Sequence, residues 1–227
     1  MQLRRRGLTL SASWNPREHY KSPDIAEVYD RVRFGSLAGR VFNRLEKRAL
    51  IRALSGLPAG SEIIDIPCGT GRLSEVLLDS GYRVTGVDIS QAMLDQAARK
   101  LARFGDRFKC KLGDAAQLPR PERPFAAAVC ARILMHFPLD RQIDFLASVA
   151  RQTDGNVVFN QSYNSGYQRV RRRLKRLLHH QIPVGFPLTE AEIKHLLHAA
   201  GLHELRRLWT APAISEGFFL VARKQYR

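Results

Sequence analysis

The sequence has few cysteines and no long apolar run. Its three cysteines, Cys68, Cys110 and Cys130, lie far apart, each beside or within an apolar segment, without the close pairs that zinc and iron–sulfur sites use. We therefore expect three buried thiols in a reducing compartment and no metal site. The chain also lacks a run of about 18 apolar residues, so no membrane-spanning helix is expected.

Acidic residues are scarce as well. The 227 residues include 37 Lys and Arg but only 21 Asp and Glu, which gives a formal net charge of +16. A surface this positive favours a polyanionic partner, namely nucleic acid, an anionic membrane or a phosphorylated substrate. The alternative is that the charge only keeps the protein soluble.

The length and the 44% hydrophobic content suit one globular domain. We expect a flexible N-terminal arm at residues 1–22 and a single domain at residues 23–227, in which residues 164–188 form a basic helical insert or cap. The basic start is similar to that of a secretory signal, but its apolar stretch is short and soon meets Pro16. The predicted location is therefore the cytoplasm, with peripheral contact to the inner face of the membrane as an alternative.

Helical and strand patterns alternate along the domain. Residues 36–54 predict a helix with one apolar face, formed by Leu37, Val41, Leu45 and Ala49. Further helices are predicted at 72–81, 90–104, 139–152 and 189–200, and strands at 61–66, 82–88, 107–112, 125–131, 156–161, 202–209 and 217–223. The alternation indicates an α/β fold with a parallel sheet covered on both faces, in which the last two strands pair as a hairpin at one edge.

The stretch IIDIPCGTGRL, residues 63–73, joins the first strand to the next helix. Gly69 and Gly71 allow a tight turn and a close approach of the backbone to a ligand, and the N–H groups of the helix point into the same cleft. Ser74 occupies the third glycine position of the dinucleotide fingerprint, which is therefore incomplete. The loop therefore indicates a nucleotide-like ligand but does not specify which one.

Three acidic residues near strand ends narrow the choice of ligand. Asp88 ends the second strand, where a carboxylate can accept both ribose hydroxyl hydrogens, and Asp114 follows the third strand, where it can accept from an adenine amino group. Asp65 precedes the glycines, where it would repel a phosphate but attract an ammonium group. The predicted ligand contains adenosine and is cationic at its other end.

With DIPCGTG, VTGVDIS and GDAAQLP in this order and spacing, the chain resembles the class I S-adenosylmethionine-dependent methyltransferases over about residues 24–223. It looks like the small-molecule and lipid type, similar to the methyltransferase domains 11 and 25. The resemblance implies a doubly wound, Rossmann-like seven-stranded sheet of order 3-2-1-4-5-7-6 with strand 7 antiparallel, and S-adenosyl-L-methionine as cofactor. Asp65 and the backbone of residues 68–71 would face its methionine part, Asp88 its ribose and Asp114 its adenine. The implied cofactor residues are Asp65, Pro67, Cys68, Gly69, Gly71, Asp88, Ile89, Asp114 and Ala115.

The acceptor site is less defined. After the fourth strand, CARILMHFP lacks the Asn/Asp-Pro-Pro-aromatic tetrapeptide of enzymes that methylate base amines, so base N-methylation is not expected. His136 in this segment is the candidate general base, and a hydrogen-bonded loop residue is the alternative. The candidate acceptor contacts are Tyr29, Arg33, Tyr163 and Arg172.

Residues 167–181, YQRVRRRLKRLLHHQ, predict a basic amphipathic helix. Such a helix can lie on an anionic membrane, bind RNA phosphates, or cover its own domain with the arginines in solvent. The sequence thus predicts a methyltransferase acting on a small, lipid- or glycan-linked anionic acceptor, with oxygen slightly favoured over nitrogen. An RNA methyltransferase and a non-catalytic binding protein with a cofactor fold remain as alternatives.

Overall fold

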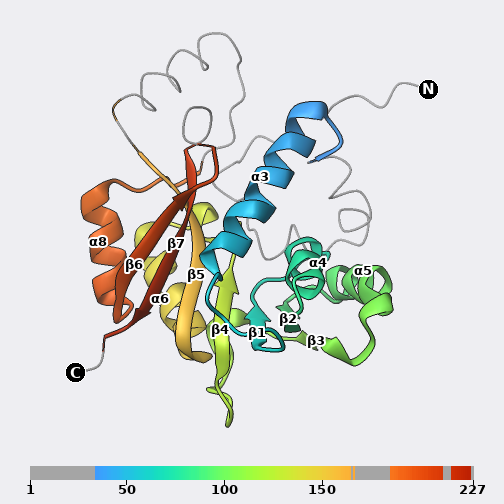
Figure 1. The fold of residues 1–227 in the computed structure, drawn as a ribbon. Coiled ribbons are helices and arrows are strands. Elements are labelled where there is room, and N and C mark those ends of the chain that lie inside the picture. Colours follow the sequence, from blue (N-terminus) through green and yellow to red (C-terminus); the bar gives the residue numbers. More distant parts are fainter. Residues whose placement is uncertain (1–33, 165, 167–184, 212–215, 226–227) are drawn as a thin grey trace.

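The computed structural model describes residues 34–164, 166, 185–211 and 216–225 (Figure 1). Its centre is one seven-stranded sheet of order β3-β2-β1-β4-β5-β7-β6. The strands are β1 (Glu62–Asp65), β2 (Arg83–Asp88), β3 (Phe108–Leu112), β4 (Phe125–Cys130), β5 (Thr153–Ser162), β6 (Leu202–Trp209) and β7 (Gly217–Lys224). The first five pair in parallel, and β7 runs antiparallel to both β5 and β6. The predicted strand order and the antiparallel strand 7 are confirmed.

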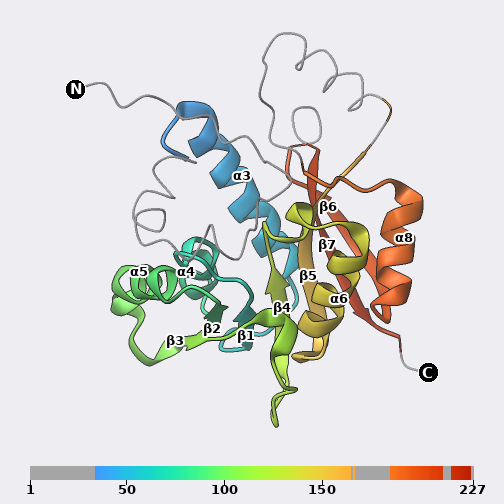
Figure 2. The ribbon, with the colours of Figure 1, turned by 180° about the vertical axis from the view of Figure 1, so that it is seen from behind.

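Helices cover both faces of this sheet (Figures 1 and 2). One face carries α3 (Leu37–Ala53), α4 (Arg72–Asp79) and α5 (Gln91–Leu101), and the other carries α6 (Leu139–Ala150) and α8 (Glu190–Ala199). Short 3-10 helices follow α5, β3 and β4, namely η1 (Ala102–Arg107), η2 (Ala115–Gln117) and η3 (Leu134–His136). Polar caps fix several of these starts: the Ser36 hydroxyl accepts from the N–H of Gly39, and Thr189 and Glu192 form a reciprocal capping box.

The two-residue period of the strands divides the core into two clusters. Ile64 and Ala128 belong to the cluster under α6 and α8, whereas Ile63 and Ala127 belong to the cluster under α3 and α4. Because both faces are covered, these strands have apolar residues at consecutive positions rather than at alternate ones only. The resulting rigid sheet holds the strand ends that carry the site.

Two expectations about burial are wrong. Leu37 and Val41 of α3 are 71% and 53% exposed, because the helix turns Glu46, Ala49 and its C-terminal turn toward the sheet instead. Cys110 is exposed, since it lies on the edge strand β3, while Cys68 and Cys130 are buried as predicted.

The helices of the described residues include none that is long and apolar enough to cross a membrane. The proposed arm at residues 1–22 and the basic segment 167–181 lie outside the described residues. Their predicted roles, and the domain limits drawn from them, stay predictions.

Candidate functional site

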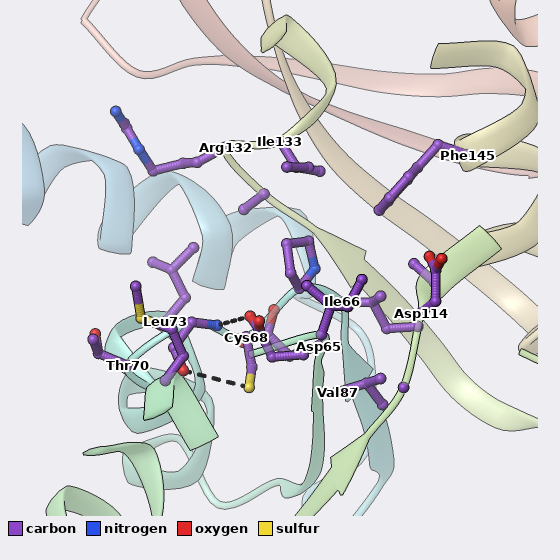
Figure 3. A pocket seen from close by; sticks show the side chains of 18 of the residues that line it. Asp65, Ile66, Cys68, Thr70, Leu73, Val87, Asp114, Arg132, Ile133 and Phe145 are labelled. Atoms are coloured by element: carbon purple, nitrogen blue, oxygen red, sulfur yellow. Dashed lines mark hydrogen bonds between the residues drawn. The ribbon is translucent and has the colours of Figure 1, made fainter. Parts of the chain in front are cut away.

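A pocket lies at the carboxyl ends of β1, β2 and β4 (Figure 3). The structure brings together at this pocket all but one of the residues predicted to bind a cofactor: Asp65, Pro67, Cys68, Gly69, Asp88, Ile89, Asp114 and Ala115. Gly71 is the exception. Residues scattered over 50 positions of sequence thus converge because parallel strands present their carboxyl ends at one edge.

Backbone hydrogen bonds hold the glycine loop against β2. The N–H of Cys68 donates to the Val87 carbonyl at 2.9 Å, and the N–H of Gly69 donates to Asp88 Oδ2 at 2.8 Å. Gly71 has a φ of +73°, and a Cβ there would lie 2.7 Å from Leu101 Cδ1. Gly71 therefore lets α4 begin close against α5, behind the pocket rather than in its wall.

Asp65 is the deepest acid of the pocket. Its Oδ2 accepts from the Ser74 hydroxyl at 2.6 Å, while its buried Oδ1 has no hydrogen-bond partner among the described residues. Burial raises the pKa of Asp65 to about 7, although the Ser74 hydrogen bond and the nearby Arg72 charge act in the opposite direction. A cation that enters the pocket would meet one carboxylate oxygen ready to accept from it.

Ser74 therefore has a function that the sequence did not reveal. In the motif it only marks a missing glycine, but in the structure its fully buried hydroxyl orients Asp65. The available signal was a buried acid at a strand end followed by a small hydroxyl residue in the first turn of the next helix.

Asp88 and Asp114 are fixed by backbone donors. Asp88 Oδ1 accepts from the N–H of Ser90 at 3.0 Å, in addition to the bond from Gly69. Burial raises the pKa of Asp88, and these backbone bonds partly oppose the rise. Asp114 caps η2 by accepting from the N–H of Ala116 at 3.0 Å, and it lies across the pocket from Thr70 (Figure 3).

The fourth-strand side of the pocket contains residues that the sequence reading missed. Ile133, Phe137 and Phe145 line it, and the two aromatic rings lie 5.9 Å apart between centroids. This wall is apolar, as a wall against a flat heterocycle should be. No motif points to Phe145, because it lies in the middle of α6 and not at a strand end.

Arg132 also lines the pocket and has an uncommon backbone. Its φ is +64°, and its N–H donates to Asn160 Oδ1 at 2.6 Å. Its guanidinium donates to Glu46 Oε1 at 3.1 Å, and Arg72 donates to Glu46 Oε2 at 2.6 Å. Glu46 is 1% exposed, so this Arg72–Glu46–Arg132 cluster is a buried link between α3 and two loops of the pocket.

The predicted acceptor residues lie elsewhere or outside the described residues. His136 ends η3 with a buried Nε2 and does not line the pocket, so its role as a base stays a prediction. Tyr163 follows β5, and its ring packs edge-on against Trp209 at 5.8 Å rather than entering the pocket. Tyr29, Arg33 and Arg172 fall outside the described residues. Within the described part of the chain, no group of three or more His, Cys, Asp or Glu side chains could hold a metal ion.

The geometry agrees with a comparison against known families. Residues 63–154 match the family model described as "Methyltransferase domain". This part of the chain is similar to a methyltransferase domain. The match runs from β1 through the loop between Asp65 and Arg72 to the start of β5, and so contains the predicted cofactor residues.

Curated relatives and solved structures carry methyltransferase names as well. The domain is similar to a demethylmenaquinone methyltransferase of Tropheryma whipplei (strain Twist), 34% identical over 120 residues, which covers 51% of this chain and 44% of the relative. It is also similar to a ubiquinone biosynthesis O-methyltransferase of Stutzerimonas stutzeri (strain A1501), 31% identical over 104 residues, with 45% and 44% covered. The chain thus spans less than half the length of these relatives.

Among solved structures, the magnesium protoporphyrin IX methyltransferase of Synechocystis PCC 6803 with bound SAH superposes with a TM-score of 0.73. It is 20% identical, and the alignment covers 92% of this chain and 98% of that one. At this identity the likeness shows the fold. The predicted fold is thereby confirmed.

Proposed function

We propose that the chain transfers a methyl group from S-adenosyl-L-methionine to an anionic acceptor that is a small molecule, a lipid-linked group or a glycan-linked group. The observation that carries the proposal is the open carboxylate oxygen of Asp65 in a pocket that also presents Asp88 and Asp114. A phosphate-bearing dinucleotide would be repelled by Asp65, whereas the ammonium group of a methionine moiety would pair with it.

The described residues fit this cofactor along its length. Asp65 would hold the ammonium group, Asp88 the ribose hydroxyls, and Asp114 the adenine amino group, with the ring against Ile133 and Phe145. When bound, the cofactor supplies a methyl group on a positively charged sulfur. The protein's own contribution is to orient it and to exclude water, because methyl transfer depends mainly on the alignment of donor and acceptor.

The nature of the acceptor is supported by the relatives and by charge. The relatives are named for menaquinone and ubiquinone chemistry, and one name specifies O-methylation. Arg72 and Arg132 line the pocket and share the single acid Glu46, and the remaining positive charge of this cluster favours an anionic acceptor. We place oxygen methylation ahead of nitrogen methylation, with His136 as the candidate base; if His136→Ala turns over at the wild-type rate with cofactor saturating, that role is excluded.

The net charge of +16 supports a location in the cytoplasm with peripheral contact to an anionic membrane. The segment 167–181 is one candidate for this contact. Tyr29, Arg33, Tyr163 and Arg172 remain candidate acceptor contacts.

The test is transfer of labelled methyl from S-adenosylmethionine into a cell extract, followed by separation of organic-soluble, RNase-sensitive and small water-soluble material. Label in the organic or water-soluble fraction supports the proposal, and its chemical release by mild base would indicate an ester rather than an ether or amine. RNase-sensitive label would instead indicate an RNA methyltransferase. No label above an Asp88→Ala control would indicate a binding protein without catalysis.

A further inference from the structure

The exposed face of α3 has an unusual composition. Four arginines at intervals of four residues, Arg40, Arg44, Arg48 and Arg52, are exposed, and Lys47 lies beside them. Glu46 is the single acid of this helix, and it is buried on the opposite side. The exposed face is therefore basic over its whole length.

Within the part of the chain that the structure describes, the arginines of this face have no acidic partners. Among the described residues, no ion pair involves Arg40, Arg44, Arg48 or Arg52. Arginines elsewhere do pair, for example Arg83 with Asp106 and Arg120 with Asp154. Arg40 donates to the Gly35 carbonyl at 2.9 Å, but like charges four residues apart on a helix destabilise it.

Aliphatic side chains interrupt the basic face. At 100° per residue, Leu37 and Val41 point to the same side as Arg44 and Arg48, and they are 71% and 53% exposed. Solvated arginines alone would not require large apolar groups among them. Basic and aliphatic side chains mixed on one exposed helix face are typical of a helix that lies in a membrane interface.

The position of α3 connects this face to the pocket. Its N-terminal half extends beyond the strands, and its C-terminal half packs on the sheet (Figures 1 and 2). Through Glu46, the buried side of α3 binds Arg72 and Arg132, which line the pocket. A surface on which α3 rests would thus lie within one helix width of the site.

We propose that the exposed face of α3, defined by Leu37, Arg40, Val41, Arg44, Arg48 and Arg52, docks on an anionic lipid bilayer. The inference rests on the peripheral membrane contact in the proposed function and assigns it to a described surface distinct from residues 167–181. RNA fits this face less well, because two exposed aliphatic residues accompany its arginines and no aromatic side chain for base stacking is exposed on it.

The first test is sedimentation of the full chain with vesicles of phosphatidylcholine alone or mixed with phosphatidylglycerol. Wild type should bind the anionic vesicles and be released by salt. The variant Arg40→Gln/Arg44→Gln/Arg48→Gln should bind roughly a hundredfold more weakly, since each basic residue near an anionic surface contributes about a fivefold gain in partitioning.

A matched control removes the same charge elsewhere. Arg99, Arg141 and Arg223 are exposed and lie on α5, α6 and β7, so Arg99→Gln/Arg141→Gln/Arg223→Gln has the same net charge as the α3 variant. It should lose no more than about threefold in binding, because its charges lie on α5, α6 and β7 and not on the docked helix. Equal losses in both variants, retention of the α3 variant, or binding of RNA in place of vesicles would each overturn the proposal.

The second test measures insertion directly. Tryptophan in Val41→Trp should be quenched by lipids brominated on their acyl chains, whereas Leu205→Trp on β6 should not be quenched above wild type. Equal quenching of the two variants would contradict docking through α3. Calorimetric titration with S-adenosylmethionine separates the two proposals. Vesicle binding without cofactor binding would contradict the proposed function alone. Cofactor binding without vesicle binding would contradict this inference alone.

Discussion

At the scale of single residues, Asp65 links cofactor binding to pH. Its pKa is raised to about 7 by burial, so the free protein holds it partly protonated near neutrality. A cationic ligand requires the ionised form, and binding should therefore release a proton below about pH 7. The affinity for S-adenosylmethionine should fall as the pH drops through this value, by up to about tenfold per pH unit.

Calorimetric titration between about pH 5.5 and 8.5 measures this dependence. Asp65→Asn should bind about ten- to a hundredfold more weakly at high pH, because a charge-assisted hydrogen bond is lost, and its affinity should vary little with pH. Ser74→Ala removes a hydrogen bond that lowers the pKa of Asp65, so its midpoint should move to higher pH. A wild-type affinity that stays constant across this range would show that Asp65 does not bind the cation.

Asp88 has two roles that its neighbours define. It accepts from the N–H groups of Gly69 and Ser90, and the same carboxylate would accept from the ribose. Asp88→Ala should abolish measurable cofactor binding and also lower stability by about 2 kcal/mol, since buried N–H groups lose a charged acceptor. Calorimetry and urea unfolding report the two effects, with Asp95→Ala on the exposed side of α5 as the control. Unchanged affinity in Asp88→Ala would refute the cofactor assignment.

At the scale of elements, α3 is joined to the pocket loops by the Arg72–Glu46–Arg132 cluster. Burial alone would raise the pKa of Glu46, but Arg132 and Arg72 outweigh it and hold the pKa below its ordinary value of 4.5. Its stabilising contribution is therefore present above about pH 4.5 and is lost as the pH falls toward the lowered value.

Removing Glu46 should be costly because two guanidinium groups stay buried. We expect Glu46→Leu to lower the free energy of unfolding by about 3–5 kcal/mol. Asp154 is the matched control, since it also pairs with two cations, Arg120 and Lys224, but is half exposed. Asp154→Leu should change stability little. Similar losses in the two variants, measured by urea unfolding at pH 7, would show that burial does not set the strength of the cluster.

At the scale of the whole molecule, the sequence determined the fold more fully than the site. Alternating strand and helix periods predicted the elements and most of their limits, because these depend on patterns within one segment. The sheet order was implied by the resemblance to the class I methyltransferases. The motif acids Asp65, Asp88 and Asp114 could be predicted for a similar reason, since each ends or follows a strand. Phe145 and the partners of Glu46 could not, because tertiary packing alone brings them to the pocket.

The error on α3 has a related cause. Spacing of Leu37, Val41, Leu45 and Ala49 indicated an apolar face, but of these only Ala49 is buried. Beside it, Glu46 and the last turn of the helix make the contact with the rest of the domain. The periodicity of apolar residues predicts that a helix has an apolar face, but it does not predict what that face contacts. The apolar residues left outside are the ones that the membrane proposal uses.

The net charge of +16 also has a consequence for stability. Like charges repel in the folded state, and on α3 the arginines at successive four-residue spacings cost about 0.2–0.5 kcal/mol per pair. Salt screens this repulsion, so the melting temperature should rise between about 20 and 300 mM sodium chloride. Arg40→Gln/Arg44→Gln/Arg48→Gln should melt higher than wild type at low salt and respond less to salt than Arg99→Gln/Arg141→Gln/Arg223→Gln. If the melting temperature of wild type falls with salt, ion pairs outweigh the repulsion between like charges. If the α3 variant is less stable than wild type, these arginines stabilise the fold rather than serve a partner.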